Sequence, residues 1–401
     1  MDDYKQWVQY TDLMVNKQIL QKASVPPYLL NMYGLMMLKK MDETKMKMPV
    51  EKRGIFTVIV HVRLLEHLLN WFLHSRYSYE EIEDTCYQLI GSVSSQIEKG
   101  LEQLPEPLPF SFDSLYKPLQ KDVRELLFLE GPFKSDVLSV YWLLWRKFLI
   151  RQPSLQNDEL RFARETAKRG NTGSSWHISY IFQLVLAGRT DDALHELKKV
   201  ETKEPDLILS IIQYYVSAKH WQEAGKMISF FIEHVRKMLS AMEERKIPPF
   251  LQSAANILQK FAEQTGKFEY YEQALIQMLP YSSRELAAFY FERRNYKKYI
   301  EFIQAAGLED ISGYALKTIM QEDPSLLLPY YHQAVKKAIL RKNRQSYKEA
   351  VRALKKLRSI YKKLKKEHVW DRYFQDLMGK TRRLRAFREE CQRGKLIHVE
   401  D

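Results

Sequence analysis

The stretch NRQSYKEAVRALKKL, residues 343–357, contains the pattern that decides the fold. It begins with a polar turn, continues with an aromatic residue and two polar residues, and then reaches the small residue Ala350. In tetratricopeptide-like helix pairs such a pattern begins a helix, and its small residue lets the neighbouring helix approach closely. The stretch therefore predicts a short helical hairpin.

Four other stretches share this local pattern, in which a Gly or polar turn precedes an aromatic residue or Thr and then Ala or another apolar residue. They are residues 186–200, 218–235, 265–279 and 293–307. The key positions Ala193, Ala224, Tyr299 and Ala350 are unevenly spaced, so a regular array is not expected. Two interpretations stay open. We favour an irregular superhelix of tetratricopeptide-like hairpins over a non-repetitive helical bundle.

The composition predicts an all-α protein. Gly and Pro are scarce, at 14 and 15 of 401 residues, and no Asn-Gly or Asp-Gly step joins two alternating apolar runs. The uncharged apolar run at residues 207–218 is too short to cross a bilayer, and the acidic start is unlike a signal peptide. The two cysteines, Cys86 and Cys391, form no paired motif. We therefore expect a cytoplasmic protein without a transmembrane segment.

Prolines at positions 105, 107, 109 and 118 predict an extended break in the helical pattern. We accordingly expect four regions. They are an N-terminal helical subdomain (1–104), a Pro-rich connector (105–118), a helical-hairpin region (119–340), and basic C-terminal helices packed on the preceding region (341–401). Within the first region, Ser78 and Glu81 form an S-x-x-E capping box that predicts a helix start.

The net charge of +13 is concentrated at the end of the chain. Residues 341–401 carry 20 Lys and Arg against 8 Asp and Glu, whereas the first 340 residues are nearly balanced. Between the cations, an apolar stripe recurs at steps of three and four residues, at Tyr347, Val351, Leu354, Leu357, Tyr361 and Leu364. The stripe predicts one packed helix over 347–366 instead of a free arm.

The basic side chains of this tail form a candidate surface for a polyanion or a partner. Its members are Lys348, Arg352, Lys355, Lys356, Lys362, Lys363, Lys365, Lys366, Arg382, Arg383 and Arg385. Three interpretations remain open: sequence-independent binding of nucleic acid, docking to an acidic protein, and a solvated outer helix face.

The sequence contains no positive sign of an enzyme or of a small-molecule site, because P-loop, G-x-G-x-x-G and G-x-S-x-G patterns are all missing. His61, His67 and His74 are spaced by six and seven residues, which does not bring all three to one metal. Neither cysteine has an evident partner base. We expect no catalytic residue and no cofactor in this chain.

Two further clusters are open to a functional interpretation, and we favour a structural one for both. Gly170 and Gly173 could bind a phosphate before the next helix, but a turn capped by Ser174 or Ser175 is more typical. The aromatic run YWLLW (141–145) could form a stacking platform beside Arg146 and Lys147, but two Trp residues three positions apart on a helix indicate core. Tyr330 and Tyr331, in the apolar run Leu326 to Tyr331, are expected to be buried for the same reason.

Several segments resemble the C-terminal helical region of bacterial SWIM zinc finger family proteins. The resemblance is strongest after residue 270, in QALIQMLPYS (273–282), DPSLLLPYYHQAVKKAILRKNRQSYKEAVRALKKLRSIYKKLKK (323–366) and TRRLRAFREECQRGKLI (381–397). Residues 3–9, 109–115 and 141–148 fit the same family more loosely.

The family's zinc finger, C-x-C followed by C-x-H, is missing from this sequence. Cys86 is followed by Tyr-Gln, and Cys391 by Gln-Arg. The resemblance places the finger upstream of the position of Met1, so zinc is expected only in family members that retain it. It implies a finger-less paralogue or a shortened reading frame, acting as an interaction protein. The implied partner is a Swi/Snf-type helicase-like ATPase or another nucleic-acid-associated protein.

Overall fold

The computed structural model describes residues 3–17, 25–129, 131–169, 175–200, 205–306 and 311–397. These residues form α-helices and short 3₁₀ helices, and no strand occurs among them, so the predicted all-α class is confirmed. The chain divides into two compact units, Met1–Met242 and Glu243–Asp401. The predicted boundary at 105–118 lies inside the first unit.

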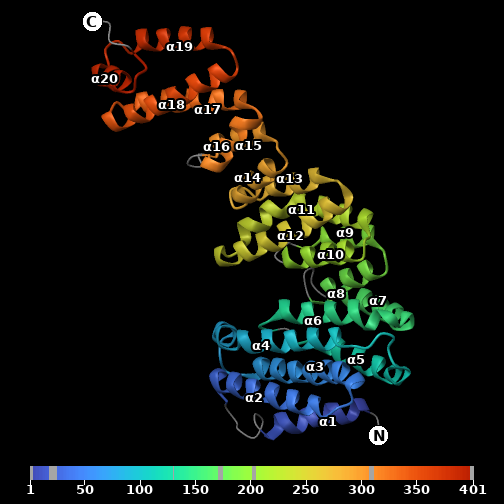
Figure 1. Cartoon of the computed structure of the whole chain (residues 1–401). Helices are drawn as coiled ribbons and strands as arrows, with labels where there is room; N and C mark the ends of the chain where they lie inside the picture. Colours follow the sequence, from blue (N-terminus) through green and yellow to red (C-terminus); the bar gives the residue numbers. More distant parts are fainter. Residues whose placement is uncertain are drawn as a thin grey trace. The chain divides into compact units, whose positions relative to one another are not determined.

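The first unit contains eleven α-helices in its described residues. They are α1 Asp3–Val15, α2 Pro27–Met46, α3 Val50–His74, α4 Tyr79–Glu102, α5 Asp113–Leu126, α6 Lys134–Lys147, α7 Pro153–Ala167, α8 Ser175–Leu186, α9 Thr190–Leu197, α10 Pro205–Ser217 and α11 Trp221–Ala241. Two 3₁₀ helices, η2 Phe110–Phe112 and η3 Leu149–Arg151, precede α5 and α7. Figure 1 shows α1 to α6 as neighbouring layers in this unit.

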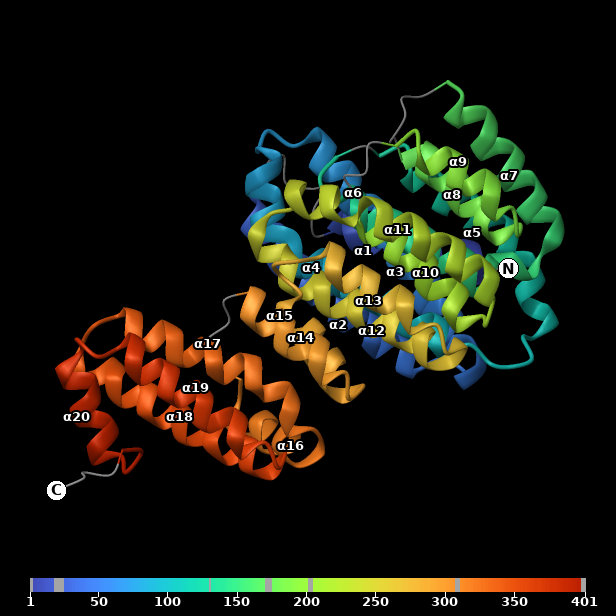
Figure 2. The ribbon, with the colours of Figure 1, turned by 90° about the horizontal axis from the view of Figure 1, so that it is seen from above.

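The second unit contains nine α-helices in its described part. They are α12 Ile247–Thr265, α13 Phe268–Gln277, α14 Ser283–Glu292, α15 Tyr296–Ala305, α16 Gly313–Glu322, α17 Leu327–Leu340, α18 Arg344–Lys363, α19 Glu367–Lys380 and α20 Arg385–Arg393. The 3₁₀ helices η4 Glu244–Lys246 and η5 Pro324–Leu326 precede α12 and α17. Consecutive helices pack as hairpins, and α18 contacts α17, α19 and α20 (Figure 2).

The hairpins repeat one turn geometry. After each of α8, α10 and α14 comes one residue with a left-handed backbone. These residues are Gly188, Lys219 and Arg294, with φ of 72°, 60° and 55°. The backbone N–H of the next residue then donates a hydrogen bond to the carbonyl five residues earlier. The bonds, Arg189 to Leu184, His220 to Tyr215 and Asn295 to Tyr290, are each 2.9 Å long. This is the Schellman ending of a helix, which satisfies carbonyls left open at its last turn.

The small residues predicted to allow close helix packing are buried as expected. Ala193 in α9, Ala224 in α11 and Ala350 in α18 are fully buried, and Tyr299 in α15 is nearly so. The helical hairpins predicted from these stretches are therefore confirmed. The capping box is also in place, because the Ser78 hydroxyl accepts a 3.2 Å hydrogen bond from the Glu81 N–H at the start of α4.

The central helix of the first unit is α3, which packs against α1, α2, α4 and α5. It is long and apolar enough to cross a membrane by length and composition, but 72% of its most apolar window is buried inside the protein. Two glycines set its distance from α4, since a Cβ on Gly54 would lie 2.7 Å from the Gly100 carbonyl oxygen. This burial is that of a core helix.

Two local predictions are wrong. The Pro-rich connector is extended only in its first part, because Pro118 lies inside α5. Pro118 lies in the second turn of α5 and removes one intrahelical hydrogen bond, but α5 buries Leu115, Leu119 and Val123 against its neighbours. The predicted helix over 347–366 ends at Lys363, because Lys365 adopts a left-handed backbone with φ of 55°.

Candidate functional site: a basic helix face and a cavity

The apolar stripe of α18 is its inner side. Tyr347, Val351, Leu354, Leu357 and Tyr361 are buried as predicted, while Leu364 lies just past the helix end and is partly exposed. The ring of Tyr347 lies 5.6 Å from that of Phe387 in α20. A Cβ on Gly394 would lie 2.5 Å from a Val351 methyl group, so the end of α20 packs closely on α18.

The outer side of α18 is the basic face, which we define as Lys348, Arg352, Lys355, Lys356, Lys362 and Lys363. All six side chains are exposed. At 100° per residue they fall within an arc of about 120° on the helix. Among the described residues none of the six makes an ion pair, although the Lys363 Nζ donates a 3.4 Å hydrogen bond to the Met320 carbonyl.

The acidic residues near α18 have other partners. Glu349 lies at the edge of the basic face and pairs with Arg341 at 3.3 Å. The carboxylate of Glu390 in α20 lies 3.0 Å from Arg344 and 3.2 Å from Arg393. The hydrogen bond from Arg344 lowers the pKa of Glu390, so this carboxylate stays ionised and occupied. Neither acid forms an ion pair with the basic face, although the charge of Lys348 also lowers the pKa of Glu390.

The other five predicted cations lie elsewhere in the second unit. Lys365 and Lys366 form the turn between α18 and α19. Arg382 and Arg383 follow α19, and Arg385 is the first residue of α20; all five are exposed. The Lys365 N–H donates a 3.0 Å hydrogen bond to the Lys362 carbonyl, so this turn directly follows the basic face. The structure thus brings six of the eleven candidates onto one helix face and leaves four on two turns and one at the start of α20.

The histidines singled out in the sequence are spread over α3. The Nδ1–H of buried His61 donates to the Thr57 carbonyl at 2.7 Å, and burial lowers the pKa of His61 to about 4. His67 Nε2 lies 2.7 Å from the Asp12 carboxylate, and His74 bonds the Asn70 carbonyl. Within the described ranges, no cluster of His, Cys, Asp or Glu has the composition of a metal site.

The remaining candidates are mostly structural. Trp142 and Trp145 are buried, which confirms the core interpretation of YWLLW. Burial raises the pKa of the Cys86 thiol to about 11 and that of Cys391 to about 12, so neither is a thiolate at neutral pH. Tyr331 is buried, but Tyr330 is only half-buried, so that prediction is half wrong. Gly170, Gly173 and Ser174 lie outside the described residues.

A cavity of about 400 Å³ lies in the first unit between α4, α6, α8 and α10. Apolar side chains form most of its wall: Leu138, Trp142, Leu143, Ile178, Phe182 and Leu207. The indole of Trp142 stacks on the Phe182 ring at a centroid distance of 4.4 Å. Four helices that are distant in the sequence supply this wall, which is why sequence reasoning missed it.

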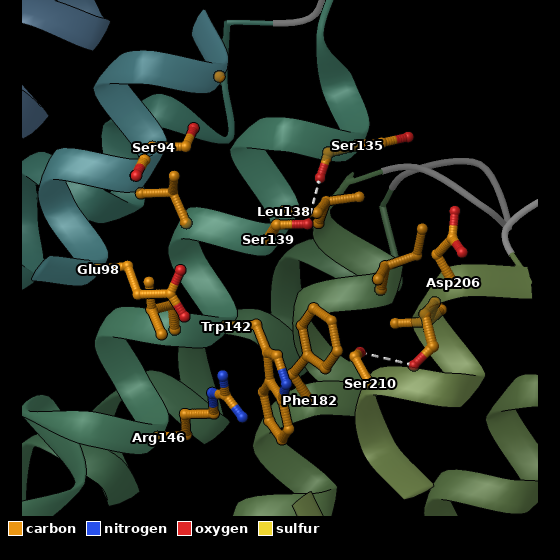
Figure 3. A pocket seen from close by; sticks show the side chains of 16 residues that line it. Ser94, Glu98, Ser135, Leu138, Ser139, Trp142, Arg146, Phe182, Asp206 and Ser210 are labelled. Atoms are coloured by element: carbon orange, nitrogen blue, oxygen red, sulfur yellow. Dashed lines mark hydrogen bonds between the residues drawn. The ribbon is translucent and has the colours of Figure 1, made fainter. Parts of the chain in front are cut away.

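Three polar groups at this cavity lack a hydrogen-bond partner in the described structure: Ser94 Oγ, Trp142 Nε1 and Arg146 Nε. Arg146 is half-buried, and among the residues that the structure describes it forms no ion pair. Burial lowers the pKa of its guanidinium, while the charge of Glu98 opposes that shift. Figure 3 shows Glu98 and Arg146 on one side of the cavity and Asp206 and Ser210 on the other.

A fully buried carboxylate, Glu159 of α7, lies in a closed polar network in the same unit. Arg124 donates to its Oε2 at 2.6 and 3.0 Å, Gln120 donates to the same oxygen at 3.0 Å, and the Tyr141 hydroxyl donates to Oε1 at 3.0 Å. Burial raises the pKa of Glu159, and Arg124 opposes that rise. Both carboxylate oxygens are hydrogen-bonded, and the network joins α5, α6 and α7.

An exposed apolar stripe runs along the outer side of α2. Tyr28, Met32, Leu35 and Met36 recur at steps of four, three and one, and each is exposed. The opposite side of α2, with Leu30, Met37 and Met41, is buried. Met-rich exposed surfaces are typical of adaptable protein-binding sites.

Comparisons with known proteins identify one curated relative. No family model matches the chain. The chain is 26% identical over 395 residues to a Bacillus subtilis (strain 168) protein named "Uncharacterized protein YwqB", and the match covers 95% of this chain and 72% of that protein. Among solved structures, it is similar to a circular tandem repeat protein with novel repeat topology, with 12% identity, 97% coverage of each chain and a TM-score of 0.20.

Proposed function

We propose that this protein is a non-enzymatic helical interaction protein whose basic face docks an acidic surface of a partner protein. The observation that carries the proposal is the basic face itself: six exposed cations lie in one arc of α18 without an ion pair in the described structure. The resemblance to SWIM zinc finger proteins supplies the partner class, a Swi/Snf-type helicase-like ATPase or another nucleic-acid-associated protein in the cytoplasm.

The charge pattern has a cost that a partner would relieve. Like charges at steps of three and four residues destabilise a helix by about 0.2–0.5 kcal/mol per pair. Burial of the apolar stripe of α18 offsets this destabilisation by the neighbouring cations. An acidic partner surface would offset the repulsion and speed association through charge complementarity. The apolar stripe of α2 supports the same function, because it is a second exposed surface suited to protein contact.

Binding to the purified helicase-like ATPase tests the proposal. We expect the full chain to bind it, and we expect the quadruple variant Lys348→Glu, Arg352→Glu, Lys355→Glu and Lys362→Glu to bind at least about tenfold more weakly. The matched control reverses four exposed lysines elsewhere, Lys117, Lys121, Lys198 and Lys260, and so changes the net charge equally. Equal losses in both variants, or no binding by two folded proteins, would refute the proposal.

The alternative function is direct, sequence-independent binding of nucleic acid through the basic C-terminal helices. The length of the basic face favours it, because residues 348–363 extend ~22 Å along the helix axis and can follow several phosphates. If all six cations contact phosphates of duplex DNA, the logarithm of the affinity should fall with the logarithm of salt concentration with a slope of about −5.

Fluorescence anisotropy with a random-sequence duplex, measured at increasing salt, tests this alternative. We expect the charge-reversal variant of α18 to reduce both the affinity and the slope, while the control variant keeps most of both. Absence of binding at low salt would exclude nucleic acid as the ligand of the basic face and leave the protein partner.

A further inference from the structure

We propose that the cavity between α4, α6, α8 and α10 binds a small carboxylic acid that has an apolar body. The carboxylate would bind Arg146, and the apolar body would lie against the wall that includes Leu138, Ile178 and Phe182. This site is separate from the basic face, and its ligand class does not depend on the partner proposed above.

Arg146 determines the charge of the ligand. A guanidinium remains charged at all physiological pH values, and a partly buried charge without a partner is costly. Nothing in the described structure bonds its Nε, and no carboxylate lies within ion-pair distance. A ligand carboxylate would supply two parallel charge-assisted hydrogen bonds, which match the planar guanidinium.

Glu98 and Asp206, the two carboxylates in the cavity wall, limit how much negative charge the site accepts. Burial lowers the pKa of Arg146 and the charge of Glu98 opposes that shift, yet Glu98 is exposed and forms no ion pair with Arg146. The charge of Glu98 would repel a second negative charge on a ligand. We therefore infer a monoanionic carboxylate in preference to a phosphate dianion.

The shape and polarity of the cavity determine the rest of the ligand. Its volume lies within the range of small-molecule pockets, whose walls are mostly apolar and carry few polar groups. Two of the lining serines are already occupied, because the Ser139 hydroxyl donates to the Ser135 carbonyl and that of Ser210 to the Leu207 carbonyl, both at 2.8 Å. Ser94 Oγ is buried and has no hydrogen-bond partner in the described structure (Figure 3).

Three probes of nearly equal shape test the ligand class: phenylbutyrate, phenylbutyramide and phenylbutylamine. Isothermal titration calorimetry on the full chain should show binding of the acid, at least about tenfold weaker binding of the amide, and no binding of the amine. Equal affinities for the three, tighter binding of the amine, or no binding of the acid at millimolar concentration would overturn the proposal.

Variants of the first unit assign the site. Arg146→Met keeps the apolar stem and removes the charge, so it should weaken binding of the acid at least about tenfold and leave that of the amide unchanged. Lys147→Met removes the same charge one residue away, at an exposed position outside the cavity wall, and should change neither affinity.

A third variant keeps the test decisive if Arg146→Met does not fold. Glu98→Gln alters an exposed residue and removes the charge that repels the ligand, so binding of the acid should become tighter, by about two- to fivefold. Weaker binding of the acid by Glu98→Gln would mean that Glu98 attracts the ligand, which contradicts a monoanionic carboxylate.

Discussion

Glu159 is the residue whose burial has the clearest energetic consequence. A buried carboxylate is tolerated only when it is paired and hydrogen-bonded, and both of its oxygens have donors from Arg124, Gln120 and Tyr141. The sequence gives no sign of this, because Glu159 lies among polar residues that read as an exposed helix face. Only the packing of α7 against α5 and α6 reveals the network.

Replacing Glu159 should therefore destabilise the first unit strongly. We expect Glu159→Ala to lower the free energy of unfolding by about 3–5 kcal/mol, because it leaves the Arg124 charge partly buried without its main partner. Urea denaturation followed by circular dichroism measures the loss. The control, Lys121→Met, removes an exposed lysine on the same helix as Arg124 and should cost less than about 1 kcal/mol. Similar losses in both variants would contradict a central role for the network.

His61 makes stability depend on pH. Its folded pKa is about 4, below the unperturbed value of 6.5, because burial disfavours the charged ring. Between these values the unfolded chain binds a proton that the folded chain does not, so stability should fall as pH decreases from 6.5 towards 4. The shift corresponds to a loss of about 3 kcal/mol.

Denaturation midpoints measured across this pH range test the effect of His61. The variant His61→Gln cannot titrate, and it should show a flatter dependence than the parent chain. His74→Gln is the control, because His74 is more exposed on the same helix. An unchanged pH dependence in His61→Gln would show that other groups cause it.

At the scale of the element, the repeated Schellman turn explains how hairpins form in a glycine-poor chain. The left-handed position carries Gly at 188 and 266 but Lys or Arg at 219, 294 and 365. A left-handed backbone costs a residue with a Cβ roughly 1–2 kcal/mol. Local preference alone would place glycine at these left-handed positions. Packing between the helices of each hairpin offsets the backbone cost and stabilises the conformation with Lys or Arg.

Exchanging glycine and non-glycine residues at these turns tests that explanation. Lys219→Gly should raise the free energy of unfolding by about 0.5–1 kcal/mol, because relief of the backbone outweighs the greater freedom of glycine in the unfolded chain. The reciprocal change, Gly188→Ala, should cost about 1 kcal/mol. A Cβ at position 188 would meet no atom within 4 Å, so this cost belongs to the backbone alone. Destabilisation by Lys219→Gly would contradict the explanation.

At the scale of the whole molecule, the two compact units each have a core of their own. In the second unit, buried side chains run from Phe250 and Phe261 in α12 to Leu357 in α18 and Phe387 in α20. In the first unit, α3 has more buried residues than any other described helix. The basic face and the cavity therefore belong to separate units, Glu243–Asp401 and Met1–Met242.

The second unit should fold without the first. We expect a fragment comprising residues 243–401 to be helical and to melt cooperatively, because its helices bury a contiguous core. Circular dichroism and amide chemical-shift dispersion measure this. A matched fragment, 341–401, lacks α17 and most of the core, and it should be largely unfolded. A disordered 243–401 fragment would show that the unit depends on the rest of the chain.

The sequence by itself determined the all-α class, the start of α4, the small residues of the hairpins and the stripe that makes α18 a packed helix. These features depend on local signals: helical periodicity, proline positions and capping residues act over a few neighbouring residues. The same signals identified the six cations of the basic face, because α18 alone sets their arc.

Only the tertiary structure decided the features that several helices build together. Pro118 lies inside α5 because burial of one face of this helix outweighs the low helix propensity of proline. The Glu159 network and the cavity around Arg146 each join helices that are far apart in the sequence. The residue pattern of one helix predicts which side of that helix is buried, but it does not predict which residues of another helix it contacts. The partner of a buried charge, or its lack of one, therefore becomes visible only when the helices are packed.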